Sequence, residues 1–126
     1  MICNKKIPII CVDLKKNRIR VHKTTLELLG FPEFVQLLIN PDTSEIVLHR
    51  SVEEDYLAHK ITYGKNKRNS YEFYSLDLLH QIRTVSPNLS DNYSYRIEGT
   101  VNKKGTLARF QLADAVCLVD KEAFRS

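Results

Sequence analysis

The stretch that decides the fold runs from Asn17 to Arg50 and reads NRIRVHKTTLELLGFPEFVQLLINPDTSEIVLHR. It begins with alternating apolar and polar residues from Ile19 to His22, and a period of two is typical of a strand with one buried face. Two apolar runs follow, at 34–40 and 45–50, on either side of the turn-forming sequence Asn-Pro-Asp-Thr-Ser. The stretch therefore predicts a strand, a short connection and a β-hairpin.

The connection between the first strand and the hairpin predicts a helix of little more than one turn. Thr24 or Thr25 offers a hydroxyl that can accept a free amide of the first turn, and three leucines between positions 26 and 29 form an apolar side. Gly30 is placed to end the helix, because glycine readily takes the left-handed conformation found after a helix C-terminus.

This order of elements resembles the swapped-hairpin domain of the AbrB family of bacterial transition-state regulators and antitoxins. The resemblance rests on a basic strand, a one-turn helix ending in Leu29-Gly30, the acidic Glu33 and a hairpin that closes on Ile46-Val47-Leu48-His49-Arg50. Of the residues that make up the basic strand, only Arg18 stands where the family signature has its own arginine. The resemblance implies a DNA-binding transcription regulator that is not an enzyme.

Three positions depart from the family pattern. Asn17 replaces the glycine of a Gly-Arg step, His22 replaces the usual proline, and Glu27 lies in a helix that is often rich in arginine. These departures bear more on the implied DNA binding than on the implied fold.

The second half of the chain repeats the order of the first. Ser75-Leu76-Asp77-Leu78-Leu79 matches Thr25-Leu26-Glu27-Leu28-Leu29, with a strand expected before it at 71–74 and a hairpin after it at 93–101 and 106–112. A last strand is expected within 113–119. One strand-helix-hairpin unit is too small to bury its own apolar side, so a second unit must cover it.

We therefore expect a mostly β fold with short helices (α+β), in which two AbrB-like units form an interlocked β-barrel. Unit one spans residues 1–60, and a degenerate second unit spans residues 61–126 and packs on the first. The two units can close on each other within one chain, as a monomer with a pseudo-two-fold axis, or unit one can pair with its copy in a homodimer.

Two further elements are expected from local signals. Because Pro8 cannot donate to a β-ladder, we expect the run that follows it, from Ile9 to Val12, to form an edge strand or the first strand. Ser51 and the acids after it, up to Asp55, suit the start of a helix.

Charge points to nucleic acid only weakly. Residues 1–68 contain 12 lysines and arginines against 8 acidic residues, whereas residues 69–126 contain seven of each, so the net charge of +4 lies in the first part. A basic set crosses the first turn and strand, and its members can lie against the phosphates of duplex DNA or form an ordinary solvated sheet face. This set is Lys15, Lys16, Arg18, Arg20 and Lys23.

A second basic set lies in the most polar run of the chain, between Tyr63 and Tyr71. Lys65, Lys67 and Arg68 can follow a nucleic-acid backbone while the flanking rings stack on bases, or can form a solvated loop.

The alternative function is a small protein from a phage or mobile element that inhibits a nucleic-acid enzyme by binding the protein. The small basic surplus, Glu27 and the tyrosines of the second half favour this hypothesis, because tyrosine is enriched at interfaces. Those tyrosines are Tyr71, Tyr74, Tyr93 and Tyr95.

No catalytic, metal or cofactor site is predicted. The four histidines lack metal-ligand spacing, and Ser75, Asp77 and His80 fit a helix cap and first turn better than a catalytic set. Three cysteines without a Cys-X-X-Cys pair suggest a reduced cytoplasmic protein. The apolar run from Ile7 to Val12 is too short to span a membrane.

Overall fold

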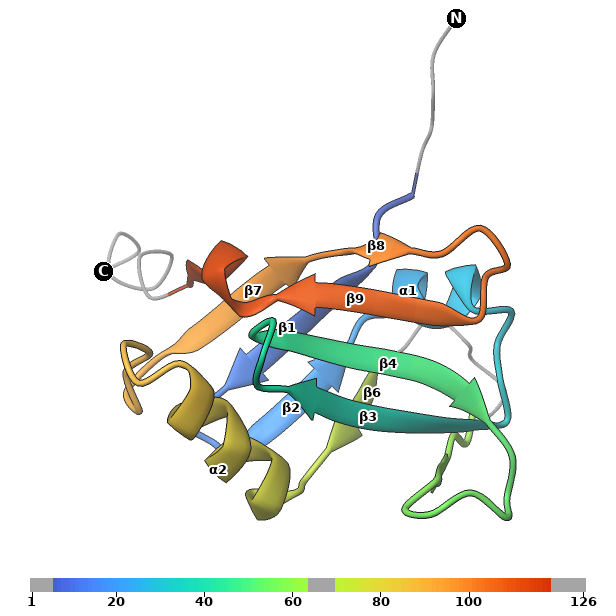
Figure 1. Ribbon diagram of the computed structural model, residues 1–126, viewed down its shortest axis with the longest axis horizontal. Coiled ribbons are helices and arrows are strands. Elements are labelled where there is room, and N and C mark those ends of the chain that lie inside the picture. Colours follow the sequence, from blue (N-terminus) through green and yellow to red (C-terminus); the bar gives the residue numbers. More distant parts are fainter. Residues whose placement is uncertain (1–5, 64–69, 119–126) are drawn as a thin grey trace, which may run out of the picture.

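The computed structural model describes residues 6–63 and 70–118, which form two antiparallel β-sheets, two α-helices and one 3₁₀ turn (Figure 1). The first sheet is ordered β10 (Val116–Cys117), β7 (Ser94–Glu98), β1 (Ile9–Asp13), β2 (Arg18–Val21) and β6 (Tyr71–Phe73). The second is ordered β5 (His59–Lys60), β3 (Phe34–Asn40), β4 (Glu45–Ser51), β9 (Leu107–Gln111) and β8 (Thr100–Val101). The helices are α1 (Lys23–Leu28), α2 (Leu76–Val85) and the 3₁₀ turn η1 (Leu112–Asp114). The expected mostly β fold with short helices is confirmed.

Each sheet combines strands from both halves of the chain. β1 and β2 share the first sheet with β6, β7 and β10, and β3 to β5 share the second with β8 and β9. The described strands form two separate sheets that both have free edges, so the expected closed barrel is not found.

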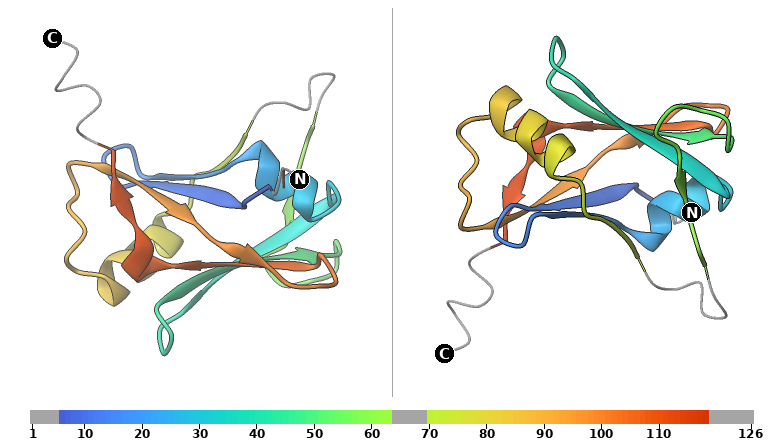
Figure 2. Two further views of the ribbon diagram at one scale, coloured as in Figure 1. Left: turned by 90° about the horizontal axis from the view of Figure 1, so that it is seen from above. Right: turned by 90° about the horizontal axis from the view of Figure 1, so that it is seen from below.

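The core lies between the two sheets (Figure 2). Alternate residues of each strand point into it, as in β1, where Ile10 and Val12 are fully buried, and in β2, where Ile19 and Val21 are. Helix α2 contacts β2 of one sheet and β3 of the other, and its buried Leu79 and Ile82 extend the core on that side. The period-two pattern of the sequence thus becomes a sandwich closed along one side by a helix.

Gly99 is where the chain passes from one sheet to the other. It separates β7 of the first sheet from β8 of the second, and its amide donates to the carbonyl oxygen of Pro8 at 2.9 Å. A Cβ at this position would lie 2.0 Å from the carbonyl oxygen of Arg109 and 2.7 Å from a ring carbon of Phe110. Only glycine allows β9 to approach this closely.

β1 is a central strand of the first sheet, not an edge strand, because β2 and β7 pair with it on either side. The expectation drawn from Pro8 was right only in placing a first strand there, since Pro8 immediately precedes the ladder. The buried Thr25 holds the start of this strand, because its hydroxyl accepts the amide of Ile9 and donates to the Ile9 carbonyl, both at 2.7 Å.

The cap of α1 differs from the expectation. His22 precedes the helix and its Nδ1 accepts the amide of Thr24 at 3.2 Å, whereas Thr25 is occupied with β1. Gly30 ends the helix as expected, with φ of +79°. In the second half, Ser75 caps α2 as expected, since its Oγ accepts the amide of Leu78 at 3.2 Å.

Among the remaining expectations, the hairpin of β3 and β4 is confirmed, with Asn40 paired to Glu45 at its closed end. The helix expected at Ser51–Asp55 is wrong: Ser51 ends β4 and the segment after it forms turns, in which the Asp55 carboxylate accepts the amide of Val52 at 3.2 Å. The last described strand, β10, is only two residues long and follows η1.

Candidate interaction surfaces

The outer face of the first sheet carries the basic strand. Arg18 and Arg20 lie on the face opposite the buried Ile19 and Val21, as the alternation predicts. Cys11 of β1 stands between two arginines on this face, since its register partners are Arg20 of β2 and Arg96 of β7. Burial raises the pKa of the Cys11 thiol, and the two neighbouring arginines only partly oppose this effect.

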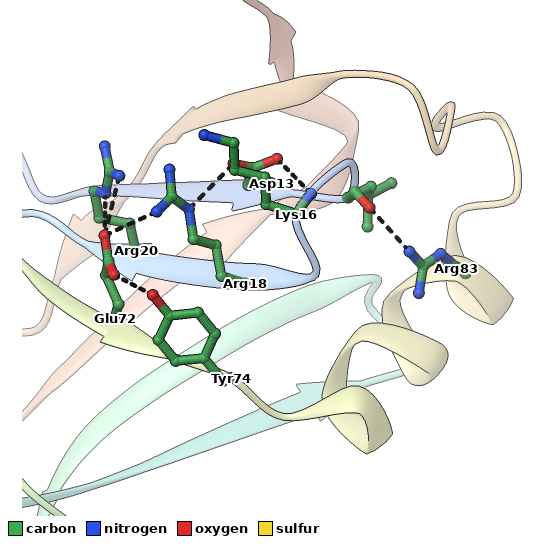
Figure 3. A network of polar contacts seen from close by, with 8 residues as sticks. Asp13, Lys16, Arg18, Arg20, Glu72, Tyr74 and Arg83 are labelled. Carbon is green, nitrogen blue, oxygen red and sulfur yellow. Dashed lines mark hydrogen bonds and ion pairs between the residues drawn. The ribbon is translucent and has the colours of Figure 1, made fainter.

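Carboxylates pair with both arginines of the basic strand (Figure 3). Glu72 of β6 accepts from Arg18 at 3.3 Å and from Arg20 at 3.2 and 3.0 Å, and Asp13 of β1 accepts from Arg18 Nε at 3.1 Å. The hydrogen bond from Tyr74, then the hydrogen bond and charges from the arginines, lower the pKa of Glu72 against the opposing effect of burial. Much of the positive charge of the strand is therefore balanced within the sheet.

The other predicted cations lie apart from this network. Lys15 and Lys16 are exposed in the turn between β1 and β2, where the Lys16 amide donates to Asp13 at 3.1 Å. Lys23 is half-buried at the start of α1, at the opposite end of β2. The expected basic set is therefore spread along the whole strand. The second set, Lys65, Lys67 and Arg68, lies outside the described residues.

Arg83 is a polar anchor that the sequence interpretation missed. It extends from α2 (Figure 3) to the turn between β1 and β2, where it donates to Asn17 Oδ1 at 2.8 Å and to the Leu14 carbonyl at 3.2 Å. Its Nε also pairs with Asp91 at 2.7 Å. Arg83 thus fixes helix α2 to the turn between β1 and β2, and its charge is paired with Asp91.

A groove of about 280 Å³ lies along the outer edge of β3. Figure 1 shows this edge with α2 on one side and the loop after β4 on the other. The groove is lined mainly by apolar side chains and strand backbone, and its described lining contains one carboxylate, no lysine and no arginine. The lining residues are Gln36, Leu37, Leu38, Ile39, Tyr56, Leu57, His59, Ser75, Asp77, Leu78 and Gln81.

The hydrogen-bond pattern of β4 decides which β3 groups face this groove. In an antiparallel ladder, hydrogen-bonded pairs alternate with pairs that are not hydrogen-bonded. The Arg50 amide donates to Thr106 and the Leu112 amide donates to Ser44, each at 2.9 Å, so the even-numbered residues of β4 bond to β9. The odd-numbered residues of β4 therefore bond to β3, where the register pairs them with even-numbered residues.

The odd-numbered residues of β3 consequently turn their backbone groups away from β4. At the start of the strand β5 takes these groups up, since the Ile61 amide donates to Glu33 at 2.9 Å and β5 pairs as far as Val35. Beyond that point the amides and carbonyls of Leu37 and Ile39 have no strand partner among the described residues. Four backbone groups thus form an open edge inside an apolar groove.

Exposed apolar side chains gather at this groove. Leu38 is 48 % exposed on the outer face of β3, and Tyr56 and Leu57 of the adjoining loop are 81 % and 68 % exposed. Leu57 also has φ of +58°, an uncommon conformation for a leucine. The sequence contains a signal for this exposed patch in the run Leu37-Leu38-Ile39. In a strand with one face in solvent, three successive apolar residues place at least one on that face.

No catalytic residues were predicted from the sequence. The contacts of α2 agree with a structural role for its polar residues. Ser75 caps the helix, and Asp77 accepts from Gln81 at 3.0 Å. Within residues 6–63 and 70–118, no group of three or more histidine, cysteine or acidic side chains is placed to hold a metal ion. No helix in this part of the chain is long and apolar enough to cross a membrane.

No protein-family model, curated protein or solved structure matches this chain significantly. The resemblance to the AbrB family accordingly stays a prediction from the sequence.

Proposed function

We propose that this chain is a protein-interaction module that binds its partner through the groove beside β3. The observation that carries the proposal is the coincidence of an unpaired strand edge with exposed apolar side chains. Open strand edges are usually protected against association, and exposed apolar patches mark binding surfaces. Here Leu38, Tyr56 and Leu57 line the same groove as Leu37 and Ile39, whose outward backbone groups have no strand partner in the described part of the chain.

The second candidate is the DNA-binding regulator of AbrB-like type. It is favoured by the outward position of Arg18 and Arg20 and by the exposed Lys15 and Lys16 in the adjoining turn. For this candidate the two units would be interlocked, which the sharing of both sheets by the two halves supports. Against it, a phosphate would have to compete with the carboxylates that already pair with the arginines.

Affinity capture separates the two candidates. The tagged chain of 126 residues is incubated with a nuclease-treated lysate of its native host, in parallel with the variants Leu38→Lys and Val116→Lys. Val116 is 61 % exposed on β10 of the other sheet, so it controls for a new surface charge away from the groove. The retained protein is then purified and its Kd for each variant is measured.

The proposal expects one partner whose Kd rises about tenfold or more for Leu38→Lys and stays unchanged for Val116→Lys, because central apolar contacts carry most binding energy. It fails if no retained protein depends on Leu38. Salt-sensitive binding to duplex DNA that is lost when Arg18 and Arg20 are replaced by glutamine would support the second candidate instead.

A further inference from the structure

We infer, resting on the proposed function, that the groove binds an extended segment of the partner as an added antiparallel strand beside β3, with basic residues between its apolar ones. Addition of a strand to an exposed sheet edge is a common mode of peptide recognition, in which main-chain hydrogen bonds give affinity and alternate side chains give specificity. The occupant is therefore a strand of another protein, not a helix or a flat surface.

The backbone geometry supports a strand. Leu37 and Ile39 present two amides and two carbonyls two residues apart, which is the spacing of the hydrogen-bonded positions in an antiparallel ladder. Leu38 between them is a non-hydrogen-bonded position on this side, so the residue opposite it would approach most closely. A bound strand would thus continue, beyond Val35, the ladder that β5 forms with the start of β3.

The apolar requirement follows from the groove walls. On α2, Leu78 is half-buried and lines the groove, and across from it Leu57 is largely exposed. Apolar side chains at alternate positions of a bound strand would lie on the same face as Leu37 and Ile39. There they would bury Leu57 and Leu78 away from water.

The basic requirement follows from charge. Asp77 lines the groove, and the exposed acids Glu53, Glu54 and Asp55 immediately precede its Tyr56. The cations that flank this loop in the sequence are the exposed Arg50 of β4 and the exposed Lys60 of β5, so the four carboxylates outnumber the nearby cations in a chain whose net charge is +4. Complementary charge steers association and excludes wrong partners, which favours a basic strand.

The same charges disfavour a second copy of this chain as the occupant. The sequence of β3, Phe34–Asn40, contains no lysine or arginine. A second copy paired through β3 would therefore not supply the basic residues that complement the acids beside the groove. A homodimer through β3 is therefore treated as an outcome that the experiment detects.

The test uses amide hydrogen exchange measured by NMR on the ¹⁵N-labelled full chain. The probe is the peptide acetyl-Thr-Lys-Val-Lys-Val-Lys-Thr-amide, and the matched control replaces its lysines by glutamate. We expect the basic peptide at saturation to slow exchange of the Leu37 and Ile39 amides by about tenfold or more, since each gains a hydrogen bond, and to leave the already bonded Leu38 amide unchanged. The acidic peptide should give no such protection.

Three results would overturn the inference. One is that neither peptide protects these amides, another is that the acidic peptide protects them equally, and the third is protection in the free chain that grows with protein concentration, which would assign the edge to a second copy. Each of these leaves the proposed function standing if the captured partner still depends on Leu38, so the two failures are distinguishable.

Discussion

Replacing Glu72 by glutamine removes the carboxylate that pairs with Arg18 and Arg20 of β2, and the contacts of Glu72 indicate how much stability is lost. Glu72 accepts three hydrogen bonds from Arg18 and Arg20, between 3.0 and 3.3 Å, and one from Tyr74. The side chain of Glu72 is 29 % exposed and that of Arg20 is 40 % exposed, so solvent screens part of the attraction. We therefore expect Glu72→Gln to lower the free energy of unfolding at pH 7 by about 1 kcal/mol, between the values of exposed pairs and of charged hydrogen bonds.

The effect depends on pH in a defined direction. Because the folded-state pKa of Glu72 is lowered, its carboxylate contributes stability that is fully present above the unfolded-state pKa of about 4.3 and is lost as the pH falls through the folded-state pKa. Urea unfolding of wild type and variant should thus differ at pH 7 and converge at acid pH. The control is Glu98→Gln, which removes one contact to Arg96 at 3.2 Å from a 55 % exposed carboxylate and should change little.

An equal loss at both pH values, or no loss at pH 7, would refute the assigned role of Glu72. The same variant also discriminates between the two candidate functions. If the basic strand binds phosphate, removing the negative charge beside Arg18 and Arg20 should strengthen binding to duplex DNA. If the partner binds at β3, its Kd should not change.

Three further predictions concern the scaffold and the groove. Gly99→Ala should lower the free energy of unfolding in urea by about 3 kcal/mol or more, or prevent folding, because its Cβ would lie 2.0 Å from a carbonyl oxygen. The control Gly105→Ala should cost about 1 kcal/mol, because this glycine has φ of +68° but a Cβ would make no contact under 3.4 Å. Equal losses for the two variants would contradict the role of Gly99 in the crossing between the sheets. Thr25→Val should cost about 2 kcal/mol by leaving the Ile9 amide without its partner and removing one of the two donors to the Ile9 carbonyl, which keeps the His22 amide. Thr25→Ser should restore most of this loss, so a tolerated valine would be evidence against this anchor. Leu38→Lys should change the unfolding free energy by only about 0.5 kcal/mol despite weakening partner binding, since the side chain is 48 % exposed, and a large loss would mean that Leu38 serves the core.

Periodicity and turn chemistry predicted several local elements correctly, although the helix expected at Ser51–Asp55 was wrong. The alternation from Ile19 to His22 placed Arg18 and Arg20 outward, and the Asn-Pro-Asp-Thr-Ser turn placed the β3–β4 hairpin correctly. Ser75 was identified as a helix cap because a hydroxyl before an apolar-periodic run has a local structural reason to be there.

The rest depended on contacts between residues far apart in the sequence. Thr25 has the chemistry of a cap, but it serves β1, because the Ile9 backbone lies beside it only in the folded chain. Glu72 neutralises Arg18 and Arg20 across a strand pair that no local pattern specifies. The open edge of β3 likewise follows from where β5 stops, which sequence alone does not determine.

The central claim, that a partner strand pairs with the outer edge of β3, is tested most directly by intermolecular NOEs in the complex with the captured partner. Leu38 is a non-hydrogen-bonded position on this edge, where Cα atoms of paired strands approach to about 4.5 Å, so its Hα should give a strong NOE to an Hα of the partner. Intermolecular NOEs confined to the face of Arg18 and Arg20, with none to Leu38, would contradict the claim.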